Sequence, residues 1–174
     1  MKFKPLLVIP LLMSASLLGA CSNESNASNT DQPAAKVVTK VSTLSDKEYG
    51  EVGTDELKDP KKEDFRKVNI KVTLSEVDKI EKEKVDMPNY KKIFNNIDKD
   101  EQTRYWFGKG DAKEDDEGNQ EVFTQEFVLY TKNLSEDDIK TALETNEIKT
   151  SWVNKDNKEK TQQEITAADN ISFK

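Results

Sequence analysis

The sequence contains no histidine and a single cysteine among its 174 residues. Without histidine, the chain cannot form a Ser-His-Asp or Cys-His catalytic group, and it lacks the imidazole that most zinc sites use. One cysteine excludes an intrachain disulfide and a cluster of thiolate ligands for a metal. The six glycines form neither a Gly-rich phosphate loop nor a Gly-x-Ser-x-Gly elbow. These absences remove the usual signatures of hydrolases and nucleotide-binding proteins.

Basic residues are also fewer than acidic residues. The chain has 27 Lys and Arg against 34 Asp and Glu, a net charge of −7. Proteins that bind nucleic acid carry an excess of basic surface, so we expect no nucleic-acid partner. The richest acidic segment, residues 111–117, fails the EF-hand pattern, because Lys113 and Thr124 would occupy its first and twelfth ligand positions. That segment is predicted to be a solvated hairpin tip, and we expect no metal and no cofactor.

The amino-terminal segment has the composition of a secretory signal peptide. Lys2 and Lys4 accompany residues 5–20, which are apolar or small and carry no charge. This run is shorter than the roughly 20 apolar residues that a membrane-spanning helix requires, and Pro5 and Pro10 would disturb such a helix. Residues 1–20 are therefore predicted to be a cleaved signal peptide.

The end of this segment, Leu18-Gly19-Ala20-Cys21, resembles the lipobox of bacterial lipoproteins. The resemblance implies that Cys21 receives a diacylglyceryl group, that a signal peptidase cuts before it, and that the acylated cysteine begins the mature protein. Two or more acyl chains hold a protein stably on a bilayer. Cys21 is therefore the expected lipidation site, with the membrane as its partner and the extracytoplasmic face of the cell membrane as the location.

The overall composition adds to this expectation. Lysine outnumbers arginine 25 to 2 and asparagine occurs 13 times, a bias typical of a Gram-positive bacterium with a low GC content. Removal of residues 1–20 takes two lysines and no acid with it, which changes the net charge from −7 to −9. A mature chain of this charge is expected to repel anionic lipids and wall polymers.

A polar tether is predicted to follow the anchor. Residues 22–35 contain no large apolar side chain and cannot bury enough surface to offset chain entropy. Residues 36–63 scatter a few apolar side chains among charges, which favours an extended linker; a short strand at residues 37–41 that joins the domain stays open. The predicted organisation is thus a signal peptide at 1–20, a lipidated tether at 21–63, and a globular domain at 64–174.

Alternating apolar and polar residues predict a mostly β domain. The expected strands are 68–74, 103–109, 121–132, 148–155, 159–166 and 171–173. Short helices are predicted at 89–97 and 135–145, the second capped by Ser135. Because strands and helices do not alternate regularly, we expect a single antiparallel, immunoglobulin-like β-sandwich, with an α+β sheet as the alternative.

Arg104 and Trp106 are the predicted binding residues. Alternation places both on the same face of a strand, and that face is free to stay exposed if the other reaches the core. An exposed tryptophan beside an arginine is typical of an interface hot spot. The alternative is that Trp106 and Trp152 are both core aromatics, which fits Trp152 better because Ile148 shares its face.

The residues favour a binding role over catalysis. The acidic residues are scattered mostly over predicted loops, and no pair stands out as the two carboxylates of a glycosidase, so we expect no enzyme. The first hypothesis is a surface-tethered module that recognises another protein or a wall-associated ligand. The second is an immunity protein that neutralises a secreted toxin, because dense acidity suits blocking a basic active site. A solute receptor is the weakest, since such receptors commonly need two lobes.

Overall fold

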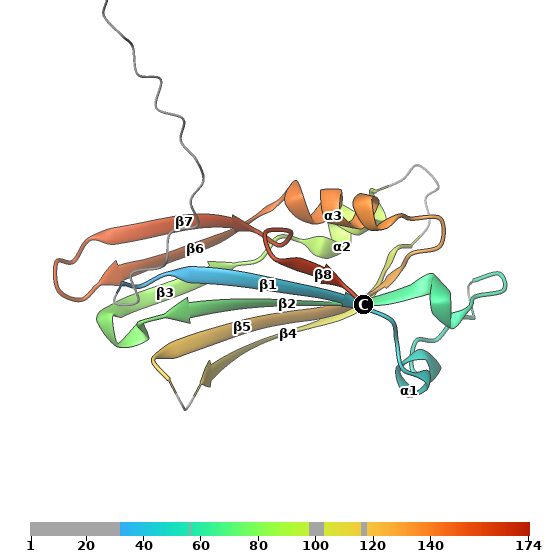
Figure 1. Cartoon of the computed structure of the whole chain (residues 1–174), viewed down its shortest axis with the longest axis horizontal. Helices are drawn as coiled ribbons and strands as arrows, with labels where there is room; N and C mark the ends of the chain where they lie inside the picture. The colour runs from blue at the N-terminus through green and yellow to red at the C-terminus, as the bar shows by residue number, and fades with distance from the viewer. Residues whose placement is uncertain (1–31, 56, 98–102, 116–117) are drawn as a thin grey trace, which may run out of the picture. The chain divides into compact units, whose positions relative to one another are not determined.

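The computed structural model describes residues 32–55, 57–97, 103–115 and 118–174. Residues 1–31, with the predicted signal peptide, the lipobox and Cys21, lie outside the described part. The described chain forms two β-sheets and three α-helices (Figure 1). The predicted mostly β, sandwich-like fold is confirmed.

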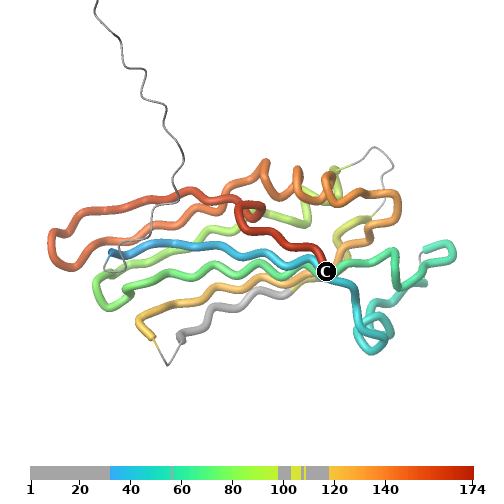
Figure 2. Tube along the Cα trace, in the orientation of Figure 1, coloured from blue at the N-terminus to red at the C-terminus, as the bar shows by residue number. Residues whose placement is uncertain are grey.

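The larger sheet has five strands in the order β4-β5-β2-β1-β8. In that order the strands span Tyr105–Asp115, Gln120–Tyr130, Phe65–Ser75, Ala35–Ser42 and Ile171–Phe173. The smaller sheet has the order β3-β6-β7, with strands at Ile80–Asp86, Glu147–Asn154 and Lys160–Thr166. The described strand pairs are antiparallel except β1 with β8, which are parallel and bring segments from the two ends of the domain side by side (Figure 2).

The α-helices are short. They are α1 (Asp46–Gly50), α2 (Tyr90–Asn95) and α3 (Glu136–Glu144), and 3-10 turns occur at Lys62–Asp64 and Val77–Lys79. Both predicted helices are confirmed: Asn89 caps α2, and Ser135 forms a reciprocal capping box with Asp138 at the start of α3. None of the described helices is long and apolar enough to cross a bilayer.

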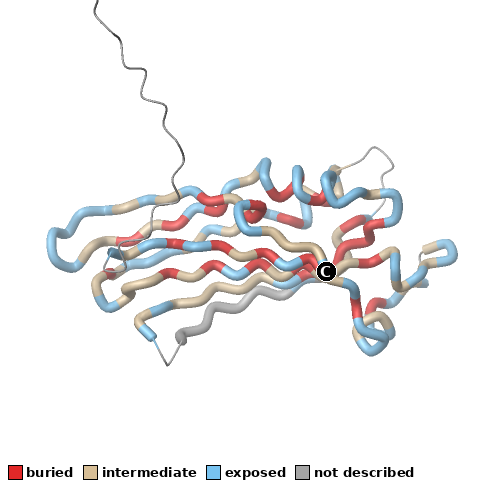
Figure 3. Tube along the Cα trace, in the orientation of Figure 1, coloured by how far each residue is buried: buried red, intermediate tan, exposed pale blue. Residues whose placement is uncertain are grey.

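The main core lies between the larger sheet and a layer made of the smaller sheet with α2 and α3. Along β1 and β2, buried and more exposed positions alternate, as Figure 3 shows. The buried positions of β2, Val68, Ile70, Val72 and Leu74, are at most 1% exposed. Ile148 and Trp152 of β6 meet them from the other layer, as the sequence pattern predicted for this pair. Each such side chain contributes about 1.5–3 kcal/mol of burial free energy.

The predicted tether at 21–63 is wrong for its second half. Residues 35–42 form β1, an interior strand of the larger sheet, so the strand left open at 37–41 exists and is longer than expected. The described residues of the segment 43–57 then fold over one end of that sheet, where Leu44 and Val52 are 3% and 4% exposed. The folded domain therefore begins near residue 35 and not at 64.

Candidate functional site

One side of the larger sheet faces away from the main core, and the described residues cover it at one end only. Residues 43–57 cover the end where Phe65, Val128 and Tyr130 lie. The remaining surface, here called the open face, carries alternate residues of β1, β2 and β5, which are half-buried or exposed. Its members on these strands are Lys36, Val38, Lys40, Ser42, Lys67, Asn69, Lys71, Thr73, Val122, Thr124 and Glu126.

The strand register arranges these residues in rows. The cross-strand pairs of β1 and β2 are Lys36 with Thr73, Val38 with Lys71, Lys40 with Asn69, and Ser42 with Lys67. Each row thus holds one lysine, taken alternately from β1 and β2. Since rows are about 6.7 Å apart and strands about 4.8 Å apart, consecutive lysines lie about 8 Å apart at Cα. We call Lys36, Lys71, Lys40 and Lys67 the lysine zigzag.

Three members of the lysine zigzag carry uncompensated charge. Lys36, Lys40 and Lys71 are exposed. None of the three forms an ion pair or a side-chain hydrogen bond with any residue that the structure describes. Their ammonium groups therefore point into solvent with all their donors available to a ligand.

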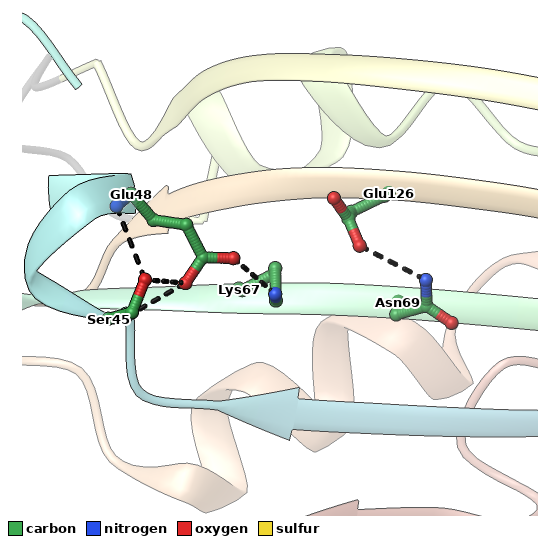
Figure 4. Close-up of polar contacts among 5 residues, drawn as sticks. All are labelled: Ser45, Glu48, Lys67, Asn69 and Glu126. Carbon is green, nitrogen blue, oxygen red and sulfur yellow. Dashed lines mark hydrogen bonds and ion pairs between the residues drawn. The ribbon is translucent and has the colours of Figure 1, made fainter. Parts of the chain in front are cut away.

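Lys67, the fourth member, is held by α1. Its ammonium donates to Glu48 Oε1, while the Ser45 amide and hydroxyl donate to Glu48 Oε2 at 2.8 and 2.7 Å (Figure 4). The hydrogen bond from Lys67 and those from Ser45 lower the pKa of Glu48 to about 2, and the same contact with Glu48 raises the pKa of Lys67. The pair fastens α1 to the sheet and neutralises one end of the zigzag.

Glu126 is the one acid that β1, β2 and β5 place on the open face. It lies in the row of Lys40 and Asn69, beyond Asn69, and its carboxylate accepts a hydrogen bond of 3.2 Å from Asn69 Nδ2 (Figure 4). The intervening β2 strand keeps Glu126 about 9.6 Å from Lys40 at Cα. Among β1, β2 and β5, the positive charge of the open face is therefore concentrated on β1 and β2.

We expect Glu48→Gln to lower stability at neutral pH by a few tenths to about 1 kcal/mol, the range for partly exposed ion pairs. Because the folded-state pKa of Glu48 is depressed, its contribution is full above its ordinary value of 4.5 and is lost as pH falls toward 2. Urea unfolding at pH 7, 4.5 and 2.5 measures this, with Glu126→Gln as the control on the same face. A wild-type advantage that stays constant down to pH 2.5 would contradict the pairing.

Only the chain's own geometry bears on the role of the open face. No protein family, curated protein or solved structure matches the chain. Within the described residues, no three acidic or cysteine side chains are placed to hold a metal ion together. Charge, exposure and strand register are therefore the features that distinguish the open face.

The structure corrects the prediction that Arg104 is an exposed binding residue. Arg104 is 1% exposed, and its Nη1 donates to the carbonyl oxygens of Lys132 at 2.7 Å and Tyr130 at 3.4 Å. Its guanidinium carbon lies 5.6 Å from the centre of the Tyr130 ring, which adds a cation–π contact. Arg104 thus holds the start of β4 to the end of β5 from inside the protein.

Trp106 is likewise a structural residue and not a free surface aromatic. It is half-buried, and its indole nitrogen donates to the carbonyl oxygens of Val52 and, at 3.1 Å, Gly53. Its ring meets Phe65 edge-on, with centroids 6.0 Å apart at 82°. Trp106 therefore fastens residues 43–57 over the end of the sheet, which agrees with the alternative that it packs in a core.

A groove of about 950 Å³ lies between α2 and α3. Ile93, Ile97 and Ala142 form its apolar part, and asparagines and charged residues of both signs surround them. Nothing in this lining selects one ligand, because the charges are mixed and the amides are neutral. The groove is therefore a weaker candidate than the open face, where free charge of one sign is concentrated.

The lysine zigzag was missed at the sequence level, although part of its signal was visible. Lys36 with Lys40, and Lys67 with Lys71, each recur at a spacing of four in an alternating strand pattern, which places each pair on one face. The pairing of β1 with β2 and its register create the zigzag, and residues 36–63 were assigned to a tether. No charge pattern could therefore be read across the two strands.

Proposed function

We propose that this protein is a lipid-anchored lipoprotein on the extracytoplasmic face of a bacterial cell membrane, where it acts as a non-catalytic binding module. The observation that carries the anchor is the lipobox-like end of the signal segment, Leu18-Gly19-Ala20-Cys21. The binding role is supported by a folded domain that presents one polar sheet face with free lysines.

Two further observations support a role without catalysis. The absence of histidine leaves carboxylates, hydroxyls and lysines as the only acid-base groups. Among the described residues, two large pKa shifts move groups away from neutrality: the pKa of Glu48 is lowered, and burial raises the pKa of the Tyr90 hydroxyl. A general acid or base that works near neutral pH needs shifts in the opposite directions.

The anchor is tested by Cys21→Ala in the full chain. We expect loss of metabolic acyl labelling and release of the protein from the membrane fraction, because no other cysteine can receive the lipid. Ser14→Ala, in the apolar segment but outside the lipobox, is the matched control and should keep both properties. Unchanged membrane retention of Cys21→Ala would refute the lipoprotein assignment.

The immunity alternative has its own distinguishing result. Capture from the host culture supernatant, with the full chain as bait, would then yield a secreted toxin bound with nanomolar affinity, and cells lacking the protein would become sensitive to that toxin. The binding-module proposal predicts no such toxin and, instead, retention of an envelope component. If the protein protects cells against a defined toxin, the binding-module proposal is wrong and the immunity function is supported.

A further inference from the structure

The lysine zigzag has the form of a track. The Cα atoms of its three free lysines, Lys36, Lys71 and Lys40, follow one another along the strands in steps of about 6.7 Å. Lys67 extends the same line by one more step, to a total of about 20 Å. Lysines placed in successive rows of an open sheet face match a linear molecule with recurring negative charges more closely than a compact anion.

The side chains around the track add hydrogen-bonding groups without adding rings. Thr73 and Thr124 place hydroxyls beside it, Asn69 places an amide, and Ser172 of β8 lies next to Lys40 in the register. In these rows, none of the described residues on β1, β2 and β5 is aromatic. The surface therefore suits a ligand with a hydrophilic backbone of hydroxyl groups and charges.

This chemistry discriminates between classes of polyanion. Proteins that bind single-stranded nucleic acid combine a basic groove with aromatic side chains on which bases stack, and the described track offers no such platform. Protein interfaces are anchored by buried aromatic and apolar side chains, whereas the rows of Lys36, Lys71 and Lys40 carry just two apolar residues on β1, β2 and β5, Val38 and Val122. A phosphodiester-linked polyol has no bases that need to stack and no apolar groups that need to be buried.

We propose that the open face binds a linear polyol-phosphate polymer, with successive phosphates lying on Lys36, Lys71 and Lys40. The inference rests on the proposed function, since it names the partner of the anchored binding module. Glu126 repels the polymer from β5 and confines it to the track over β1 and β2. The net charge of the chain, which predicted repulsion of such polymers, does not describe this face.

The decisive variant replaces Lys36, Lys40 and Lys71 with glutamine in the full chain, extracted from membranes in a nonionic detergent. The probe is poly(glycerol phosphate) of defined length, and binding is measured across a salt series. We expect the affinity to fall at least about tenfold at low salt. The slope of log affinity against log salt should fall by about 2, because each phosphate contact on a flexible strand contributes roughly 0.7.

A matched control separates the track from net charge. Lys91, Lys132 and Lys160 are exposed lysines outside the zigzag, and their replacement by glutamine removes the same charge. We expect this triple variant to bind the polymer nearly as the wild type does. An equal loss in both triple variants would overturn the proposal, since the attraction would then be nonspecific.

Glu48→Gln provides a gain-of-affinity test. It releases Lys67 from its ion pair and extends the free track by one step, so binding should tighten about threefold with a steeper salt slope. Unchanged or weaker binding would count against the track.

Competing probes decide the class of ligand. Poly-L-glutamate and an oligothymidylate of matched charge should bind at least about tenfold more weakly than poly(glycerol phosphate). Equal or preferential binding of either one, or no polymer binding at low salt, would overturn the proposal. If the polymer fails to bind while acyl labelling of Cys21 and membrane retention persist, the proposed ligand is wrong, whereas the proposed lipid anchor is still supported.

Discussion

Replacing Arg104 with alanine is expected to lower the free energy of unfolding by about 3–4 kcal/mol, a large part of the stability of a domain this size. The loss has identifiable parts. The carbonyl oxygens of Tyr130, which is buried, and Lys132, whose hydrogen bond is part-buried, lose their charged donor, and a buried carbonyl left unsatisfied costs about 1–3 kcal/mol. The cation–π contact with Tyr130 and the packing of the long side-chain stem disappear as well.

Two conservative variants separate these parts. Arg104→Met keeps most of the buried volume but removes the charge and the hydrogen-bond donors. It should therefore recover only the part of the lost unfolding free energy that comes from packing. Arg104→Lys keeps a charge, but a single ammonium cannot reproduce the planar fork of a guanidinium, and we expect it to recover less than half of the loss. Urea unfolding followed by tryptophan fluorescence gives the midpoints and slopes.

A cost below about 1 kcal/mol for Arg104→Ala would show that this side chain is not the internal clamp between β4 and β5. Arg66 supplies the comparison, because the chain has no other arginine. Arg66 donates to the Glu63 and Phe65 carbonyls, both within three residues along the chain. Since these contacts are local and only half-buried, Arg66→Ala should cost about 1 kcal/mol or less.

The strands of the domain were predictable where one face is buried and the other is solvated. In β2 and β6 the apolar period of two agrees with the side that reaches the core, so pattern and packing gave the same answer. The interior position of β5 also followed from its second half, where Phe127 and Leu129 enter the main core while Val128 and Tyr130 lie under residues 43–57.

The segment 36–63 was harder because its stabilising contacts are distant in sequence. Val37 and Val41 belong to β1, but β1 is held by β2 and β8, and β8 lies at the other end of the domain. Helix α1 is too short for periodicity to reveal. Ser45 and Glu48 do form a Ser-x-x-Glu capping box, and this signal would have located the helix.

Arg104 and Trp106 show why exposure cannot be read from alternation alone. The prediction placed both on one face, but the register between β4 and β5 shifts between Tyr105 and Phe107, so a strict period of two does not hold there. The end of the sheet is also covered by residues 43–57, which the sequence had assigned to a linker. A polar or aromatic residue on an outward face becomes buried when a distant segment folds over it.

Phe127→Ala is expected to cost about 3–5 kcal/mol, the range for removing a fully buried aromatic ring. Phe127 is 1% exposed and stacks with two rings, Tyr90 with centroids 5.3 Å apart and Tyr105 with centroids 5.1 Å apart, and Phe94 lies at 5.7 Å. These rings belong to β5, α2 and β4, so the substitution removes contacts that join the helix to the sheet. Little local relaxation can close the resulting cavity, because β5 is paired on both sides.

Phe123 provides the matched control for this substitution. It lies on the same strand and the same side as Phe127, but it is half-buried and packs at the margin of the core. Phe123→Ala should therefore cost less than half as much in the same urea experiment, and Phe127→Leu should fall between the two because it fills part of the volume. Equal losses at positions 123 and 127 would show that the stack of Phe127 with Tyr90 and Tyr105 adds nothing beyond its size. A larger loss of unfolding free energy at position 127 would show that the Phe127 ring joins α2 to the larger sheet.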